Sequence, residues 1–506
     1  MSLATVYSRS QDGIHAPLVS VEVDLANGLP AFSIVGLPEA AVKESRDRVR
    51  AAITNSRFEF PARRITVSLA PADLPKDGGR FDLPIALGIL AASKQIPAEP
   101  LGQYEFAGEL GLSGEIRPVR GLLPMALAGR RAGHSLVVPA ENADEASLAG
   151  GVEVLAARHL LEVCAHLAGE SRMTPHTPEW PLSNETAAEI DMADVRGQQH
   201  AKRALEIAAA GQHNLLMIGP PGTGKTMLAS RLPTILPPLT EDEAIEAAAV
   251  ASISNGGFDL NQWKRRPVRS PHHTASGVAL VGGGSHPRPG EISLAHNGVL
   301  FLDELTEFDR RVLEVLREPI ETGHITISRA ARQAEFPARF QLIAAMNPCP
   351  QGYDCDLAAN CRCTPEQQRR HRTRISAPLL DRIDLQIEVL RPADRGTTQT
   401  SPAESSRTVR ERVLEARERQ LARAGKPNAQ LNNRELERDC ALATADAGVL
   451  QDAIRRFGLS MRAEHRILKV ARTIADLCGS AKVETPHLTE ALSYRAMDRW
   501  LGRRGV

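Results

Sequence analysis

The sequence predicts a multidomain α/β protein with three folded parts. At 506 residues the chain is too long for a single hydrophobic core, since domains average roughly 100–200 residues. Strand and helix patterns alternate in an α+β order over 1–170 and in the order of a parallel α/β sheet over 189–393, whereas 407–506 shows only helical periodicity. The polar stretches 171–188 and 394–406 lack that periodicity, and we interpret them as linkers.

The individual elements follow from hydrophobic periodicity. Short runs of β-branched and apolar residues predict strands, and apolar residues spaced three and four apart predict helices. In the first part we expect strands at 19–23, 65–69 and 136–138 and helices at 38–55 and 84–93. In the second part we expect buried strands at 214–218, 298–302 and 340–346 and a helix at 227–232. In the third part we expect amphipathic helices at 407–423, 434–456, 462–478 and 486–500.

Composition narrows the class of protein. A hydrophobic content of 42% and a charged content of 24% are ordinary for a soluble globular chain. No stretch approaches the roughly 18 uninterrupted apolar residues of a membrane span, and the N-terminus lacks the blocks of a signal peptide, so we expect a cytoplasmic protein with no membrane partner. Basic and acidic residues balance at 61 each, so any contact with nucleic acid must use a local basic feature.

One short segment carries the strongest chemical signal in the chain. It reads Gly219, Pro220, Pro221, Gly222, Thr223, Gly224, Lys225 and Thr226, which fits the Walker A pattern G-x-x-x-x-G-K-[ST]. In that pattern backbone N–H groups surround the phosphates, Lys225 reaches the β and γ oxygens, and Thr226 holds Mg²⁺. A predicted strand precedes the segment and a predicted helix follows, so the helix N-terminus faces the phosphates. The segment predicts that a nucleoside triphosphate binds here.

Polar residues at the ends of the later strands complete a hydrolytic site. Asp303 and Glu304 follow the strand at 298–302, where the aspartate would orient Mg²⁺ and the glutamate would polarise the attacking water. Asn347 follows the strand at 340–346 and is a candidate for positioning that water. Arg382 is a candidate arginine finger, which would stabilise charge on a phosphate bound to a neighbouring subunit.

These motifs, together with the segments 194–198 and 265–298, resemble the AAA+ ATPases and more narrowly their magnesium-chelatase-like branch with the ComM/YifB family. The resemblance covers nearly the whole chain. It implies that Asn347 is sensor 1, that Arg382 acts in trans, and that Arg462 is sensor 2 from a helical lid. It further implies ATP as the nucleotide and a ring, usually a homohexamer.

The segment 319–339 resembles the hairpin that this branch inserts before sensor 1. Residues 324–328 and 334–338 alternate like two strands and leave Arg329 and Arg332 at the tip. In a ring such tips would gather in the pore and bind the phosphates of DNA without reading sequence. The alternative is that both arginines are ordinary turn residues at a subunit interface.

Four of the seven cysteines lie close together in the sequence, namely Cys349, Cys355, Cys361 and Cys363. Four thiolates are what tetrahedral Zn²⁺ requires, but paired C-x₂-C knuckles are absent. Where the family commonly reads Cys-Pro-Cys, this chain has Cys349-Pro350-Gln351, so Cys355 would have to replace a ligand. Two hypotheses remain: a Zn²⁺ site or reduced thiols.

The segments 68–93 and 107–141 resemble the proteolytic domain of Lon-type proteases. The resemblance implies a dyad of serine and lysine, and the corresponding positions here are Arg80 and Met125. A guanidinium and a thioether cannot serve as nucleophile and general base in that scheme. We therefore expect a non-proteolytic domain that assembles the ring or handles a partner or nucleic acid.

The family resemblance implies a ring-forming, ATP-driven DNA motor that moves single-stranded or branched DNA, a branch-migration helicase of natural transformation with recombination partners. Two alternatives stay open. One is the motor subunit of a metal-insertion enzyme of the magnesium-chelatase type, and the other is a regulator that remodels protein assemblies without DNA specificity. ATP turnover stimulated by DNA, by porphyrin or by a protein distinguishes them.

Overall fold

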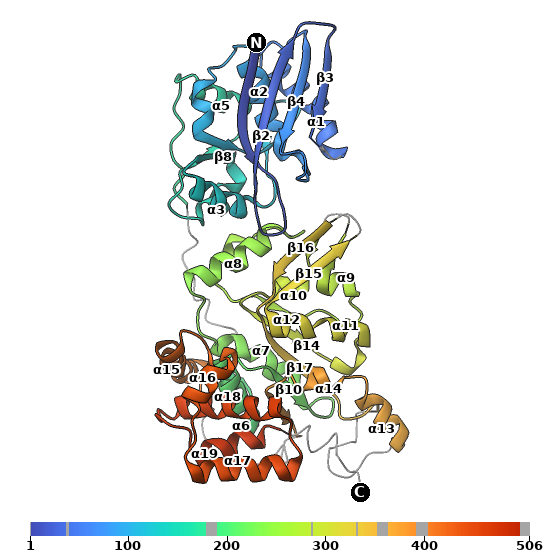
Figure 1. Cartoon of the computed structure of the whole chain (residues 1–506), viewed down its shortest axis with the longest axis vertical. Helices are drawn as coiled ribbons and strands as arrows, with labels where there is room; N and C mark the ends of the chain where they lie inside the picture. Colours follow the sequence, from blue (N-terminus) through green and yellow to red (C-terminus); the bar gives the residue numbers. More distant parts are fainter. Residues whose placement is uncertain are drawn as a thin grey trace.

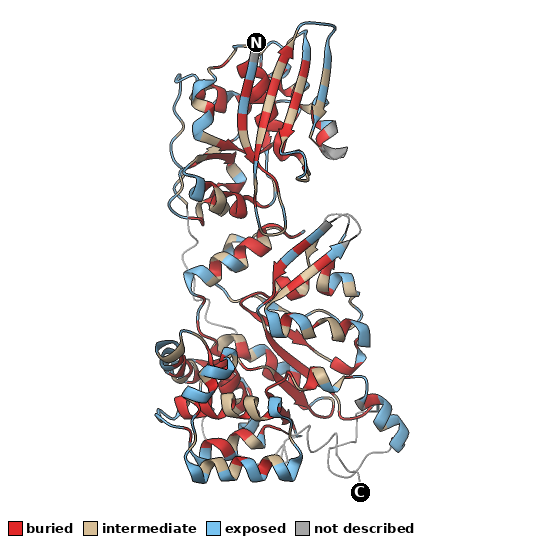
Figure 2. Cartoon of the chain, viewed as in Figure 1, coloured by how far each residue is buried: buried red, intermediate tan, exposed pale blue. Residues whose placement is uncertain are grey.

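The computed structural model describes residues 2–36, 40–178, 190–284, 287–329, 332–351, 363–390 and 403–495. Three bodies follow one another along the long axis of the molecule, with the N-terminal sheet at one end and the C-terminal helices at the other (Figure 1). The two large sheets, one in the N-terminal body and one in the central body, contain buried strands (Figure 2). The predicted fold class, a multidomain α/β protein with a parallel sheet and a helical C-terminal part, is confirmed. In the described part of the chain, no helix combines the length and apolarity that a bilayer crossing requires.

The N-terminal body is a mixed seven-stranded sheet in the order β3-β4-β2-β1-β5-β8-β9. Side chains alternate between buried and partly exposed along β2, because the helices cover only one face of this half of the sheet. Helix α2 is buried along its whole length and fills the core between the sheet and α1. The bounds are β1 (Ser2–Arg9), β2 (Leu18–Ala26), β3 (Ala31–Val35), α1 (Ala40–Asn55), β4 (Arg64–Ala70), α2 (Asp82–Ala92), β5 (Tyr104–Phe106), β6 (Glu109–Leu110), β7 (Ile116–Arg117), α3 (Leu122–Ala132), β8 (Ser135–Pro139), α4 (Ala143–Ser147), β9 (Val154–Ala157) and α5 (Leu160–Leu167).

The central body is a five-stranded parallel sheet in the order β11-β14-β17-β10-β18. Strands β10, β14 and β17 are buried throughout, since separate hydrophobic cores pack on the two faces of the sheet. The bounds are α6 (Gln199–Gly211), β10 (Leu215–Ile218), α7 (Lys225–Ile235), α8 (Glu241–Ser252), β11 (Val268–Arg269), α9 (Gly277–Val281), β12 (Gly282–Gly283), β13 (Arg288–Pro289), α10 (Glu291–Leu294), β14 (Val299–Leu302), α11 (Arg310–Val315), α12 (Arg317–Thr322), β15 (His324–Arg329), β16 (Arg332–Pro337), β17 (Gln341–Met346), α13 (Pro365–Arg372), α14 (Ala377–Leu380) and β18 (Leu385–Glu388).

The C-terminal body is helical and shares one hydrophobic core with α6 and α7 of the central body. Its helices are α15 (Ser406–Ala424), α16 (Asn433–Asp439), α17 (Thr444–Phe457), α18 (Met461–Leu477) and α19 (Thr485–Ser493). The single helix predicted at 434–456 is wrong, because it is broken between α16 and α17. The break lets Cys440 leave helical geometry and bury its side chain beside Leu431 and Leu436.

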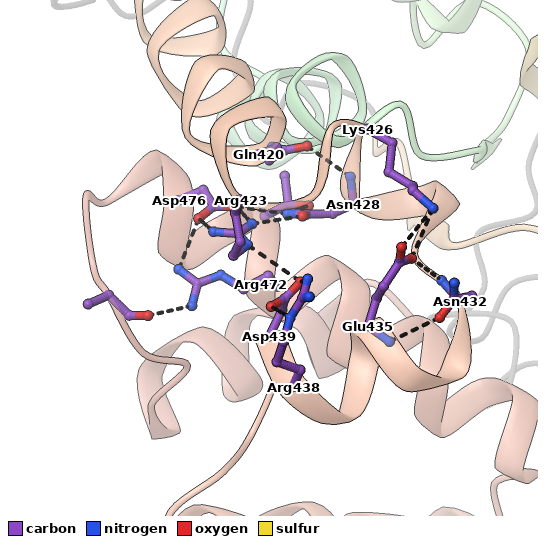
Figure 3. A network of polar contacts seen from close by, with 12 residues as sticks. Gln420, Arg423, Lys426, Asn428, Asn432, Glu435, Arg438, Asp439, Arg472 and Asp476 are labelled. Atoms are coloured by element: carbon purple, nitrogen blue, oxygen red, sulfur yellow. Dashed lines mark hydrogen bonds and ion pairs between the residues drawn. The ribbon is translucent and has the colours of Figure 1, made fainter.

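A buried ionic network holds α15, α16 and α18 together (Figure 3). Its centre is Asp476, only 1% exposed, which accepts hydrogen bonds from Arg472, Arg423 and Asn428 at 2.7–2.9 Å. A buried carboxylate is stable only when such donors replace its lost water. Together with the ion pair between Arg423 and Asp439 of α16, at 3.9 Å, the network fixes the relative positions of α15, α16 and α18.

The N-terminal body packs on α8 of the central body. Ala248 and Ala249 of α8 lie in the same hydrophobic cluster as Leu122 and Met125 of α3. At the end of α8 the Ser252 carbonyl accepts a hydrogen bond from Gly121 N at 3.2 Å, and the Ser252 hydroxyl donates one to Glu145. Small residues on α8 allow this close approach between the two bodies.

Candidate functional site

The loop between β10 and α7 forms a cradle for phosphate. Gly222 and Gly224 have φ angles of +77° and +90°, and a Cβ built at either position would meet no atom within 4 Å. These left-handed conformations, which favour glycine, turn the backbone around open space at the N-terminus of α7. Thr223 closes the loop by donating to Pro220 O at 3.0 Å.

Lys225 points into this cradle. Its Nζ donates to the carbonyl oxygens of Gly219 and Pro220 at 2.7 and 3.0 Å and to Asn347 Oδ1 at 3.2 Å. Burial lowers the pKa of Lys225, while the nearby Asp303 and Glu304 oppose that change. The ammonium group is therefore partly desolvated and placed where phosphate oxygens would replace the carbonyls. The contact between Lys225 and Asn347 also places the end of β17, where sensor 1 is predicted, at the cradle.

Two oxygen donors face each other beside Lys225. Thr226 Oγ1 donates to Asp303 Oδ2 at 2.6 Å, which joins the first turn of α7 to the end of β14. Hydroxyl and carboxylate oxygens are the ligands that Mg²⁺ prefers, and a Mg²⁺ ion bound with phosphate usually takes only one or two protein ligands. The pair therefore fits the predicted role of Thr226 and Asp303.

Glu304 lies next to this pair in a left-handed backbone conformation, with φ at +50°. His273 Nδ1 lies 3.1 Å from Glu304 Oε2, and the His272 ring packs against the His273 ring with centroids 4.1 Å apart. Both histidines lie in the segment 265–298, which carries part of the family resemblance. The contact with the candidate general base was missed, because nothing in the spacing of the two residues predicts it.

Arg382 and Arg462 do not join the cradle within one chain. Arg382 is 6% exposed, its Nη2 lies 2.5 Å from Glu321 Oε1, and its Nη1 donates to Pro378 O at 2.6 Å. Arg462 is exposed in the first turn of α18, and its charge contributes to lowering the pKa of Glu321. Their assignments as arginine finger and sensor 2 stay predictions, and Glu321 is a partner that sequence reasoning missed.

The predicted hairpin is present as β15 and β16. The strands pair antiparallel from His324↔Pro337 to Arg329↔Arg332, which places the two arginines at the tip. Ile325, Ile327 and Phe336 anchor the base in the core beneath. The Arg329 and Arg332 side chains lie outside the described residues, so their contact with DNA stays a prediction.

Among the basic residues of the segment 264–269, Arg266 and Arg269 are half-buried. Arg266 donates to Pro237 O and Asn297 O at 2.6 Å each, and burial lowers its pKa. Arg269 forms an ion pair with Glu291 at 2.6 Å. These two arginines therefore support the structure locally.

Of the four candidate zinc ligands, Cys349 and Cys363 have buried side chains in contact with each other. Cys355 and Cys361 lie outside the described residues, so the choice between Zn²⁺ and reduced thiols stays a hypothesis.

The two positions that correspond to a Lon-type dyad are both buried. Arg80 Nη1 donates to Arg9 O at 3.3 Å and Nη2 to Arg120 O, and burial lowers the pKa of Arg80 to about 10. Met125 is fully buried in the cluster that contains α8. A hydrophobic contact between domains thus occupies the neighbourhood where a catalytic lysine is expected in that scheme.

Comparison with known families gives matches along most of the chain. Residues 191–397 match the family described as "Magnesium chelatase, subunit ChlI", residues 21–142 match "Subunit ChlI of Mg-chelatase", and residues 403–495 match "Magnesium chelatase, subunit ChlI C-terminal".

Three relatives place the chain more closely. The competence protein ComM of Haemophilus influenzae is 54% identical over 99% of both chains. YifB of Salmonella typhimurium is 53% identical over 99% of this chain and 98% of its own. The magnesium-chelatase 38 kDa subunit of Rhodobacter capsulatus is 28% identical over 59% of this chain and 85% of its own. The chain therefore belongs to the ComM/YifB family of magnesium-chelatase-like AAA+ ATPases.

Proposed function

We propose that this protein is an ATP-driven motor that assembles as a homohexameric ring and moves single-stranded or branched DNA. The observation that carries the proposal is the cradle in which Lys225, Thr226, Asp303 and Asn347 converge. Similarity to a competence protein over the whole chain supports DNA as the substrate and a role in recombination during natural transformation. In this proposal the protein works in the cytoplasm.

Each residue has a distinct task in the proposed hydrolysis. Lys225 binds the β and γ phosphate oxygens, and Thr226 and Asp303 hold Mg²⁺, which supplies charge stabilisation on the phosphates when bound. Glu304 accepts the proton of the attacking water, and Asn347 orients that water. Arg382 of the adjacent subunit and Arg462 of the lid stabilise charge on the transferred phosphoryl group.

The hairpin β15–β16 would be the part that grips DNA. Its base is rooted in the core beside β14 and β17, the two strands that carry Asp303 and Asn347. A change at the nucleotide can therefore reach the tip through packed side chains. Arginines at the tip would bind the phosphate backbone through charge, without reading bases.

A second candidate is a metal-insertion motor, because a magnesium-chelatase subunit is 28% identical over 59% of this chain. It is the weaker candidate, since that subunit covers 59% of this chain at 28% identity, whereas the competence protein covers 99% at 54% identity. It predicts ATP turnover that responds to a porphyrin and ignores DNA.

The test is ATP turnover by the purified protein alone and with single-stranded, duplex and four-way-junction DNA, at two salt concentrations. We expect stimulation that weakens as salt rises, because counterion release drives phosphate binding. Arg329→Ala should remove most of the stimulation and leave DNA-free turnover intact. Arg310→Ala, at an exposed arginine of α11 that is not part of the hairpin, is the matched control. If none of the DNA molecules changes the turnover, DNA is rejected as the substrate and only the proposed ATPase activity remains.

A further inference from the structure

The ion pair between Glu321 and Arg382 joins the hairpin to the predicted arginine finger. Glu321 lies in the last turn of α12, and Gly323 at φ +74° ends that helix just before β15 begins. Ala338 N, just beyond β16, donates to Gly323 O at 2.7 Å and closes the base of the hairpin. A displacement of the hairpin would therefore move Glu321 with it.

The loop that carries Arg382 is held from two other sides. The Arg382 carbonyl accepts hydrogen bonds at 3.1 Å from Asn214, directly before β10, and from Arg466 of α18. Arg466 also pairs with Asp384. Arg382 thus connects the hairpin, the strand that enters the Walker A loop, and the lid.

The guanidinium of Arg382 is directed inward. It is 6% exposed and bonds only to its own chain through Glu321 and Pro378, while its buried Nε meets no acceptor among the described residues. The guanidinium is therefore held by its own chain and is not presented on the surface of the molecule. Releasing it requires that the contact with Glu321 be broken.

Glu321 itself is accessible, because its side chain is 49% exposed. Hydrogen bonding from Arg382 lowers the pKa of Glu321, and the charges of Arg382, Arg462 and Arg466 add to the effect. The carboxylate therefore stays ionised at neutral pH and attracts both the predicted finger and the predicted sensor 2.

We propose that Glu321 is a positioning residue that restrains Arg382 within its own chain until the hairpin engages its substrate. The proposal rests on the proposed ATPase function and adds its regulation. The Glu321 carboxylate and the γ-phosphate of a neighbouring site compete for the same guanidinium, since both are anions that accept its N–H groups. When the hairpin moves, Glu321 moves away from Arg382, and the guanidinium becomes available to the phosphate.

The experiment compares ATP turnover of the full-length protein and of Glu321→Gln, with and without single-stranded DNA. We expect DNA-free kcat to rise roughly three- to five-fold, the scale of a partly exposed ion pair, with little change in KM for ATP. The ratio of DNA-stimulated to DNA-free turnover should fall toward one. Adding Arg382→Ala to Glu321→Gln should abolish the gain, because the gain depends on the released arginine.

Glu318→Gln is the matched control, because Glu318 is an exposed glutamate on the same helix, and it should behave like the wild type. Glu321→Asp keeps the charge and should retain the low DNA-free turnover, which gives a second reading if the glutamine variant folds poorly. A uniform loss of turnover with and without DNA would reduce Glu321 to a structural role and overturn the inference. Equal turnover of Glu321→Gln and wild type would also overturn the inference, but it would leave the proposed ATPase function intact. A wild type without ATP turnover would overturn both proposals.

Discussion

Lys225 and Glu304 have separable tasks at the nucleotide site. Lys225 is the cation in the cradle, whereas the Glu304 carboxylate lies 3.1 Å from His273 Nδ1, and the Glu304 N–H donates to Asp303 Oδ1 at 2.9 Å. We therefore expect Lys225→Ala to abolish detectable ATP binding, because a charge-assisted contact is lost. Glu304→Gln should bind ATP normally and lower kcat by about 10²–10⁴-fold, the usual contribution of a general base.

Titration with a fluorescent ATP analogue and single-turnover hydrolysis measure the two effects separately. Glu307→Gln, an exposed glutamate nearby, is the control and should change neither. Tight binding by Lys225→Ala, or brisk hydrolysis by Glu304→Gln, would show that the site has been assigned to the wrong residues.

The same site shows which residues a sequence can predict. The Walker A segment and Asp303 are predictable, because contiguous motifs fix both their chemistry and their place at strand ends. His273 and Glu321 are not, since each meets its partner only through the tertiary fold. The sequence predicted that Arg382 stabilises charge on a phosphate. Only the structure shows that Arg382 is buried within its own chain.

At the scale of elements, the contact between the C-terminal helices and the central sheet depends on Asp384. We call this contact the joint. Asp384 lies beside β18 and pairs with Arg466 of α18, and its Oδ2 accepts from Asn214 N at 3.0 Å. Burial alone would raise the pKa of Asp384, but the charges of Arg466 and His213 outweigh it and hold the pKa well below its ordinary value. The ionised form therefore stabilises the joint.

This arrangement makes the stability of the joint depend on pH. Because the folded-state pKa lies below the unfolded value of about 3.9, the stabilisation is complete above that pH and is lost as the pH falls below it. Asp384→Asn should cost roughly 3 kcal/mol at pH 7, since it leaves Arg466 without its anion. Calorimetric unfolding at several pH values should show the gap between wild type and variant narrowing below about pH 4. Asp452→Asn, an exposed site on α17, is the control, and a gap independent of pH would contradict the prediction.

Elements were predictable where periodicity is long or burial is complete. The buried strands β10, β14 and β17 follow directly from apolar runs, and the hairpin follows from alternation. The break between α16 and α17 was missed, because the apolar pattern continues through it and only the local burial of Cys440 explains it.

At the scale of the whole molecule, α8 connects the N-terminal body to the catalytic strands. Its Glu246 carboxylate lies 3.0 Å from His296 Nε2 and accepts from Asn297 at the same distance, just before β14 begins. The hydrogen bond from His296 contributes most to lowering the pKa of Glu246 to about 2. The turn after β1 reaches the hairpin as well, since a Cβ on Gly13 would lie 3.1 Å from Glu335 O. The N-terminal body is thus placed to influence both the hairpin and the site.

In the proposed ring, Arg382 and Lys225 should serve the same reaction from different subunits. Lys225→Ala and Arg382→Ala should each be inactive as uniform assemblies. In an equal mixture, random assembly pairs an intact Lys225 with a neighbour's intact Arg382 at about a quarter of the interfaces, so turnover should return to roughly that fraction of wild type. If Arg382 served its own chain, every subunit would carry one defect and mixing would restore nothing. Mixed turnover, with light scattering to verify assembly, therefore decides whether hydrolysis belongs to the subunit or to the interface between subunits.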